Sequence, residues 1–230
     1  HLPLQFIPQT SDQPTGAFIC LHGLGKTGEW QKEQFYSLMG ERTQFPHIQI
    51  IFPSARSRLC KYRGHEMHSW FAVRRIKDTE KFEIQLDAVE LEDSLNYVDS
   101  IVEDVAARIP RHRIIVGGVS QGALLGLLYG YYKGNTNVKG IISLSGFYPE
   151  LYMDRFRQDS HHLPELLYAN FNEDPVIPYQ MSRVGYDFLK SKNILIEEHT
   201  FSCKEHNINE GMLNTTYDWI LKMIPQRDST

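Results

Sequence analysis

The chain has 230 residues, which is enough for one sizeable hydrophobic core, and we expect a single domain over residues 1–230. Hydrophobic residues make up 41% and charged residues 23% of the sequence, a balance that is typical of globular proteins and excludes an intrinsically disordered chain. The formal net charge is −4 with both signs interspersed, so we expect no nucleic-acid partner. No apolar run is long enough for a transmembrane segment.

The beginning of the sequence and its cysteines bear on cellular location. Residues 1–13 have neither a basic start nor a long apolar stretch, so we interpret them as an N-terminal extension and not as a signal peptide. Cys20, Cys60 and Cys203 form no Cys-x-x-Cys pair, and their odd number argues against a disulfide scaffold. A reducing, cytoplasmic location is the simplest expectation.

Short apolar runs rich in β-branched residues alternate with segments whose apolar residues have helical spacing. The runs lack a clean polar alternation, as in central parallel strands that are covered on both faces. In the longest helical segment, 83–109, Leu91, Leu95, Val98 and Val102 recur at intervals of three and four residues. This order predicts an α/β protein with a doubly wound, mostly parallel sheet and helices on both faces. The predicted strands are 16–23, 47–54, 113–120, 138–146, 165–171 and 194–201, and the other predicted helices are 121–132, 178–191 and 209–224.

The first predicted strand leads into a glycine-rich loop, His22-Gly23-Leu24-Gly25. In doubly wound folds, functional residues gather beyond the carboxyl ends of the strands, and such a loop can donate backbone N–H groups to an anion. A phosphate-binding loop is the alternative interpretation. Neither G-x-G-x-x-G nor G-x-x-x-x-G-K-[ST] is present, so we expect neither nucleotide binding nor a cofactor.

Residues 55–82 have poor periodicity, and we expect them to form an irregular excursion over the sheet edge, near the mouth of an active site. The stretch contains Cys60, His65, Glu66 and His68, which are residue types that bind metals. Because neither H-E-x-x-H nor a pair of cysteines is present, we expect no metal site here.

The segment "IIVGGVSQGALLG", residues 114–126, predicts a strand, a turn at Ser120 and a helix. A sharp strand-to-helix turn requires small residues two positions before and after the serine, which are Gly118 and Gly122 here, and this pattern is a nucleophile elbow. The backbone N–H groups of Gln121 and Leu24 are then the expected donors to an oxyanion. The alternative is a structural turn in which Ser120 only caps the helix.

A nucleophilic serine needs a basic histidine and a carboxylate that orients the histidine, in the chain order serine, acid, histidine on this type of fold. The strand 165–171 leads into Asp174, in a loop that contains two prolines. We prefer Asp174 as the acid. Glu173 would point elsewhere, and Asp187 lies within a predicted helix.

Four histidines follow Ser120 in the sequence. His161 and His162 precede the predicted acid in a polar connection, where solvated surface residues are expected. His199 lies inside a predicted strand, whereas His206 lies in the loop beyond it. Because the base must reach across the strand ends from a loop, we predict that His206 is the base.

The motifs "LHGLGKTGEW", "MHSWF", "GGVSQGA" and "DPVIP", followed by the late histidine, resemble the acyl-protein thioesterase/lysophospholipase group of α/β-hydrolases, over residues 16–225. The resemblance implies an α/β-hydrolase fold and a serine hydrolase that cleaves acyl thioesters or esters, on S-acylated proteins or lysophospholipids, as a monomer or weak homodimer. It implies a Ser120, Asp174 and His206 triad, the oxyanion donors Leu24 and Gln121, and a position for Trp70 beside the entrance of the active site. We predict substrate contacts by Trp70, Phe71 and Phe171.

Some residues depart from the pattern of that family. Lys26 stands where the family has aspartate, His68 and Ala72 replace a proline and an aspartate, Ala123 replaces a glycine after the elbow, and residues 170–172 replace H-G-D. None of these departures removes a predicted triad residue. A short-chain carboxylesterase and a catalytically silent binding subunit are the alternative functions.

Overall fold

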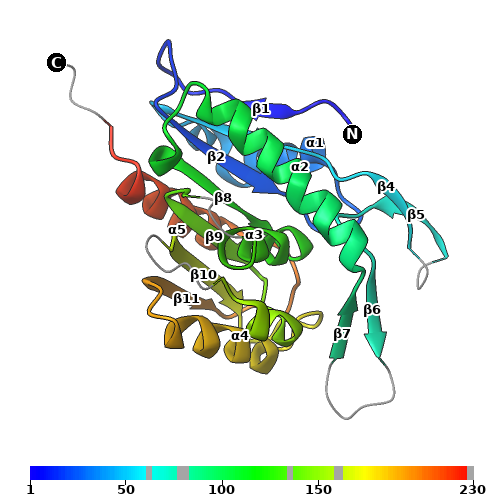
Figure 1. The fold of residues 1–230 in the computed structure, drawn as a ribbon. Coiled ribbons are helices and arrows are strands. Elements are labelled where there is room, and N and C mark those ends of the chain that lie inside the picture. The colour runs from blue at the N-terminus through cyan, green and yellow to red at the C-terminus, as the bar shows by residue number, and fades with distance from the viewer. Residues whose placement is uncertain (61–63, 77–82, 134–136, 158–162, 227–230) are drawn as a thin grey trace.

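A seven-stranded sheet with the order β1-β3-β2-β8-β9-β10-β11 forms the centre of the computed structural model (Figure 1). The structure describes residues 1–60, 64–76, 83–133, 137–157 and 163–226. Strand β1 pairs with β3 in antiparallel fashion, and all other neighbours in this sheet are parallel. The predicted, mostly parallel sheet is therefore confirmed. The strands are β1 (Gln5–Ile7), β2 (Gly16–Leu21), β3 (Ile48–Phe52), β8 (Ile114–Val119), β9 (Gly140–Leu144), β10 (Glu165–Phe171) and β11 (Ile196–Phe201).

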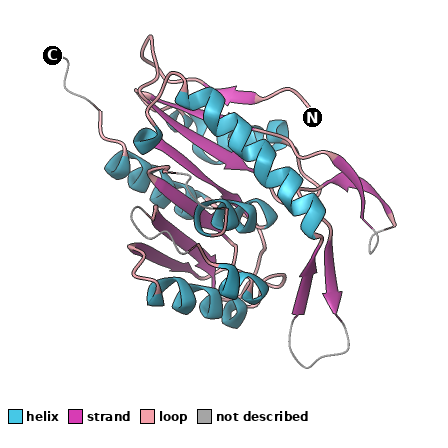
Figure 2. Cartoon of the chain, in the orientation of Figure 1, coloured by secondary structure: helices cyan, strands magenta, loops and turns pink. Residues whose placement is uncertain are grey.

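Helices cover both faces of this sheet, as predicted (Figure 2). Helices α2, α3 and α4 contribute to one apolar core, and α1 and α5 contribute to the core on the opposite face. The helices are α1 (Gly28–Met39), α2 (Ala88–Ala106), α3 (Gln121–Tyr131), α4 (Tyr179–Ser191) and α5 (Glu210–Met223), and the short 3₁₀ turns are Gly40–Thr43, Arg111–Arg113 and Glu150–Arg155. Helix α1 has only a narrow buried stripe, and the sequence analysis did not predict it.

Strand β2 shows why the central strands are apolar throughout. Successive side chains of a strand point to opposite faces of the sheet. Ile19 and Leu21 accordingly belong to the core beneath α2 and α3, whereas Phe18 and Cys20 belong to the core beneath α1 and α5. Both faces therefore require apolar residues, and no polar alternation remains to be seen in the sequence.

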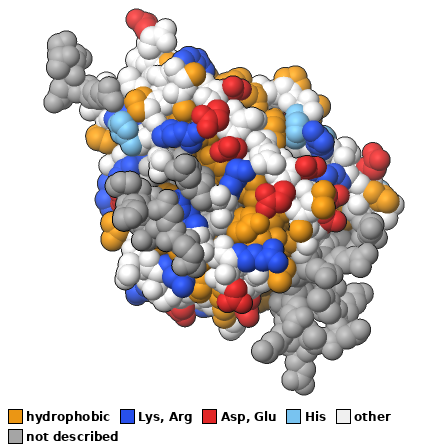
Figure 3. Space-filling model, viewed as in Figure 1, with side chains coloured by type: hydrophobic (Ala, Val, Ile, Leu, Met, Phe, Trp, Pro, Cys, Tyr) orange, Lys and Arg blue, Asp and Glu red, His pale blue; other side chains and the backbone are white. Residues whose placement is uncertain are grey.

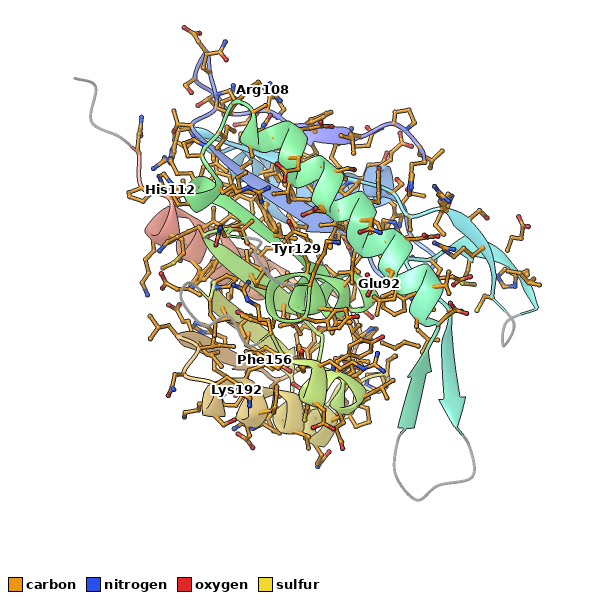
Figure 4. All side chains as sticks on the ribbon, viewed as in Figure 1. Glu92, Arg108, His112, Tyr129, Phe156 and Lys192 are labelled. Carbon is orange, nitrogen blue, oxygen red and sulfur yellow. The ribbon has the colours of Figure 1, made fainter. Side chains whose placement is uncertain are left out.

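Helix α3 follows the predicted elbow and is buried along its whole length. It packs on the same face of the sheet as α2 and lies beside that helix (Figure 1), and Tyr129 of α3 and Glu92 of α2 are labelled in Figure 4. The Tyr129 hydroxyl donates to Asp99 of α2 at 2.9 Å, and the Tyr132 hydroxyl donates to Glu92 at 2.6 Å. The helix that begins at the elbow is thus fixed by the core on one side and by polar bonds to α2 on the other.

Residues 55–82 are not irregular in the part that the structure describes, so this prediction was wrong. They contribute to two antiparallel hairpins, β4 (Ser57–Cys60) with β5 (His65–His68), and β6 (Val73–Ile76) with β7 (Glu83–Leu86). Residues 61–63 and 77–82 lie outside the described residues. Strands of four residues are too short for a clear period of two.

The predicted start of the long helix at residue 83 was too early, because α2 begins at Ala88 after its N-cap Asp87.

The surface is mixed in charge. Figure 3 shows the face that carries α2, α3 and α4, where Lys and Arg side chains lie among Asp and Glu side chains. Among the described residues, no helix is both long and apolar enough to cross a membrane.

Candidate active site

The carboxyl ends of four parallel strands deliver the predicted site residues to one edge of the sheet. Ser120 follows β8, Asp174 and His206 lie in the loops that follow β10 and β11, and the loop of residues 22–25 follows β2. Parallel strands end at the same edge, where doubly wound folds bind ligands. Residues that are far apart in the sequence therefore meet there.

Ser120 occupies a conformation that non-glycine residues rarely adopt, with φ 54° and ψ −113°. Its backbone N–H donates to the carbonyl of Leu144 on β9 at 2.9 Å. A Cβ atom at Gly118 or Gly122 would lie 2.2 Å from the carbonyl oxygen of Leu21 on β2. Both glycines are therefore required by the close approach of β2, which is the physical basis of the G-x-S-x-G spacing.

Ser120, His206 and Asp174 form a continuous hydrogen-bonded chain. Ser120 Oγ lies 2.7 Å from His206 Nε2, and His206 Nδ1 lies 2.7 Å from Asp174 Oδ2. The side chain of Asp174 is 2% exposed, whereas that of His206 is 17% exposed. A serine hydroxyl that faces an imidazole nitrogen in this way can transfer its proton, so the arrangement is suited to nucleophilic chemistry.

Asp174 is held in place by its own loop. Its Oδ1 accepts the backbone N–H groups of Val176 at 2.7 Å and Ile177 at 2.9 Å. The other oxygen, Oδ2, is left to accept the Nδ1–H of His206, which makes Nε2 the acceptor of the Ser120 hydroxyl proton. The acid, the tautomer of the base and the direction of proton transfer are thus determined together.

The weaker alternatives lie apart from this chain of bonds. Glu173 is exposed and contacts Ser202 and Lys204. His199 bonds to Glu197 on the edge strand β11, 3.2 Å away. His161 and His162 lie outside the described residues. Of the described alternatives, none approaches Ser120 through a hydrogen bond.

The glycine-rich loop after β2 lies directly beside the elbow. A Cβ atom at Gly23 would lie 3.6 Å from the Cβ of Ser120. The N–H of Lys26 closes a turn to the carbonyl of Gly23, and the N–H of Gly25 donates to the carbonyl of His68. Among the described residues, neither the N–H of Leu24 nor that of Gln121 donates to a protein acceptor. Both N–H groups are therefore available to an anionic oxygen.

His22 fixes the base of this loop, and the sequence analysis assigned it no role. Its Nε2 accepts the N–H of Ala55 at 2.9 Å, so its Nδ1 carries the proton and donates to the carbonyl of Gly23 at 2.7 Å. The pKa of His22 is lowered to about 4, chiefly by burial; the bond to Gly23 opposes this shift, and the electrostatic effect of His68 adds to it. The imidazole is neutral at pH 7, as its acceptor role requires.

The predicted substrate contacts are all buried in the structure. Trp70 and Phe71 have no exposed surface, and Phe171 is 1% exposed and packs in the core beneath α5. The indole N–H of Trp70 donates to the carbonyl of His22 at 2.8 Å. Through this bond, Trp70 supports the glycine-rich loop from the interior of the protein. Direct contact of Trp70, Phe71 and Phe171 with a substrate stays a prediction.

Two departures from the family pattern have a structural explanation. The ammonium group of Lys26 lies 4.0 Å from the centre of the Trp30 ring, so it stacks on the first turn of α1. His68 Nδ1 lies 2.8 Å from the carbonyl oxygen of Ala55 and so bonds within the hairpin region. In the described part of the chain, no group of three or more His, Cys, Asp or Glu side chains could hold a metal ion.

The fold and this arrangement of side chains define an α/β-hydrolase. The phospholipase/carboxylesterase family model matches residues 3–224, and the chain belongs to that family. It is 28% identical to lysophospholipase-like protein 1 of Mus musculus, with 98% of this chain and 93% of the relative covered. It is 26% identical to acyl-protein thioesterase 1 of Mycosarcoma maydis, with 95% of each covered. The fold is similar to that of Zea mays acyl-protein thioesterase 2, with a TM-score of 0.78 at 20% identity, over 97% of this chain and 100% of that chain.

Proposed function

We propose that this protein is a serine hydrolase that cleaves acyl thioesters and esters through an acyl-enzyme, with Ser120 as nucleophile, His206 as base and Asp174 as the orienting acid. The observation that carries the proposal is the pair of 2.7 Å bonds that join the three side chains. Membership of the phospholipase/carboxylesterase family supports the same reaction class.

The reaction begins when Ser120 Oγ attacks the carbonyl carbon and its proton passes to His206 Nε2. The carbonyl π electrons move onto the oxygen, which becomes a tetrahedral oxyanion. When the intermediate collapses, the bond to sulfur or oxygen breaks and the leaving group takes the proton from the imidazolium. Water then repeats the sequence on the acyl-enzyme, which releases the carboxylic acid and restores the Ser120 hydroxyl. Asp174 stabilises the imidazolium through Nδ1–H and does not itself become protonated.

The oxyanion receives hydrogen bonds from the N–H groups of Leu24 and Gln121 in this proposal. Both groups lack a protein acceptor among the described residues. Gln121 follows Ser120 in the chain, and Leu24 follows Gly23, where a Cβ atom would lie 3.6 Å from the Cβ of Ser120. Gln121 is also the first residue of α3, where the helix dipole favours negative charge. Removing one such donor from other hydrolases raises the barrier by about 3–4 kcal/mol.

The proposed substrates are S-acylated proteins or lysophospholipids. The support is the printed names of two relatives, an acyl-protein thioesterase and a lysophospholipase-like protein, which this chain matches over nearly its whole length. An oxyanion hole binds only the carbonyl oxygen of the substrate, so it does not select between a thiolate and an alkoxide leaving group. Selectivity then depends on the acyl chain, and each methylene that becomes buried contributes about 0.8 kcal/mol.

Labelling with a fluorophosphonate probe tests the reaction class without a guess about the substrate. We expect the wild type to be labelled and Ser120→Ala to be unlabelled, with hydrolysis of an activated ester lowered by about 10⁴-fold or more. Ser202→Ala, at an exposed position in the loop before His206, is the matched control and should label normally. An unlabelled wild type would indicate a catalytically silent binding protein instead.

A chain-length series tests the substrate class. We expect kcat/KM on acyl thioesters to rise from acetyl to medium or long chains and then to level off, with the same trend for p-nitrophenyl esters, below micelle-forming concentrations. A preference for acetyl over octanoyl in both series would indicate a short-chain carboxylesterase.

We also propose a cytoplasmic, monomeric or weakly dimeric protein. Free Cys20, Cys60 and Cys203 are compatible with a reducing compartment. The edge strand β11 carries charged residues, Glu197 and Glu198, which disfavour pairing of sheet edges between copies. Microscopy of a fluorescent fusion and sedimentation velocity test the two statements. A luminal signal, or a dimer that persists at submicromolar concentration, would contradict them.

A further inference from the structure

We infer that Trp70 is a positioning residue, which ties together the two halves of the proposed oxyanion hole without touching the substrate. The inference rests on the proposed function, because it concerns the donors Leu24 and Gln121. These donors belong to separate segments, the loop after β2 and the start of α3. Both must point at the same oxygen, at about 2.7–3.1 Å, for the oxyanion to be stabilised.

Trp70 is joined to the elbow side through its backbone. Its N–H donates to Gln121 Oε1 at 3.0 Å, and the Nε2 of the same amide donates to the carbonyl of Phe71 at 2.7 Å and to Ser69 Oγ at 3.2 Å. Both ends of the Gln121 side chain are thus bonded to residues 69–71. This fixes the first residue of α3, whose backbone N–H is one proposed donor.

Trp70 is joined to the loop side through its side chain. The indole N–H donates to the carbonyl of His22 at 2.8 Å, and the indole and imidazole rings lie 4.9 Å apart. The His22 carbonyl belongs to the peptide bond between His22 and Gly23, one residue before Leu24. The N–H of Leu24 extends from the next peptide plane, whose carbonyl, that of Gly23, accepts the Nδ1–H of His22 at 2.7 Å. The indole therefore acts on the second donor through His22, since it donates to the His22 carbonyl and lies against the His22 ring.

Trp70 is itself anchored from a third direction. The Ser94 hydroxyl of α2 donates to the Trp70 carbonyl, and the rings of Trp70 and Tyr97 are stacked with centres 6.5 Å apart. The side chain has no exposed surface, so no substrate atom can reach it without a rearrangement, and the inferred positioning role of Trp70 replaces its predicted contact with a substrate. Any influence on catalysis must pass through Gln121 and His22, which places Trp70 among positioning residues.

Trp70→Phe removes the indole donor and keeps an aromatic ring in the core. Because a small misplacement of a catalytic donor is costly, we expect kcat/KM to fall about 10- to 100-fold through kcat, with KM nearly unchanged. A trifluoromethyl ketone forms an oxyanion adduct with the serine, so its Ki should rise in parallel. The Ki of the methyl ketone with the same chain, which binds without forming this adduct, should change less than twofold.

Trp219→Phe is the matched control for the loss of a buried indole. Trp219 is 2% exposed on α5 and packs against Gly140, at the opposite end of the strands from the site. We expect this variant to lose stability but to keep kcat and both Ki values. If Trp70→Phe unfolds, benzothienylalanine at position 70 keeps the fused rings and removes only the N–H donor.

The two ketones separate positioning from packing. Equal changes of both Ki values in the folded Trp70 variants, or changes no larger than those of Trp219→Phe, would overturn the inference. Failure of the proposed function would look different, because the wild type would then neither react with a fluorophosphonate nor bind the trifluoromethyl ketone more tightly than the methyl ketone.

Discussion

His22 and His206 lie at the same edge of the sheet, and their surroundings give them different tasks. His206 is partly exposed and bonds to two side chains, Ser120 and Asp174. His22 is fully buried and bonds to two backbone groups. A residue that exchanges protons with a substrate needs access to it, whereas a residue that must stay neutral is served by burial.

We expect His22 to make the free energy of unfolding depend on pH. Burial lowers its pKa to about 4 in the folded state, below the value near 6.5 expected after unfolding. Its contribution to stability is therefore complete above about pH 6.5 and is lost as the pH falls toward 4. We expect the free energy of unfolding of the wild type to fall about 3 kcal/mol more between pH 7 and pH 4 than that of His22→Asn, which cannot titrate there. Urea denaturation at both pH values measures this, and equal declines would contradict it.

The two histidines near the last strand provide a direct test of the predicted base. His206→Ala should lower kcat/KM by about 10⁴-fold or more, and adding Ser120→Ala should lower it little further, because the two act as a unit. His199→Ala, on β11 and bonded to Glu197, should stay within about threefold of the wild type. The reverse ranking in an ester assay would mean that the base has been misplaced.

At the scale of elements, the elbow depends on how closely β8 and α3 approach β2. The carbonyl of Leu21 lies where a side chain at Gly118 or Gly122 would be. The same contact brings Gly23 against Ser120, so the geometry of the elbow and the position of the oxyanion loop are set by one packing interaction. A change that pushes these elements apart must alter both.

Gly122→Ala should therefore lower both stability and activity. The new Cβ would lie 2.2 Å from the backbone oxygen of Leu21, and relieving such overpacking costs about 1–3 kcal/mol. Gly211→Ala in the first turn of α5 is the control, because its nearest neighbour would be 3.5 Å away. That variant should be stabilised by up to about 1 kcal/mol. Urea midpoints and fluorophosphonate labelling rates check both variants, and a Gly122→Ala protein with normal labelling would contradict the role of this contact.

At the scale of the whole molecule, the carboxyl ends and the amino ends of the parallel strands have different roles. The carboxyl ends carry the candidate site. At the amino ends, the guanidinium of Arg113 donates to the carbonyls of Thr15 and Pro225, and His47 bonds to the carbonyl of Ile224. These bonds tie the segment before β2 to the segment after α5, so they join parts of the chain that are distant in sequence.

Arg113→Met should separate stability from catalysis. It leaves two buried or half-buried carbonyls without their charged donor, which costs about 2–3 kcal/mol. Its distance from the site along the strands predicts an unchanged kcat/KM below the melting temperature. Arg108→Met, at an exposed position labelled in Figure 4, should change stability by less than about 0.5 kcal/mol. Thermal unfolding with ester kinetics measures both effects, and a loss of kcat in folded Arg113→Met would contradict the separation.

The sequence by itself determined the parts of this protein that depend on local patterns. Apolar runs with β-branched residues identified the six parallel strands. Five of them, β2, β3, β8, β9 and β10, are buried on both faces, whereas the edge strand β11 is only partly buried. The spacing of Gly118, Ser120 and Gly122 predicted the sharp turn after β8. Chain order and loop position predicted Asp174 and His206, which the structure brings together with Ser120.

Only the tertiary structure decided what depends on neighbours from distant segments. The short strands of the two hairpins and β1 are too brief for a clear period, and α1 buries only a narrow stripe. The link from Gln121 through Trp70 to His22 consists of hydrogen bonds between three separate segments, so no spacing in the sequence could reveal it. A linear pattern records which face of an element is buried, whereas the partner of a buried polar group is known only when the elements have packed.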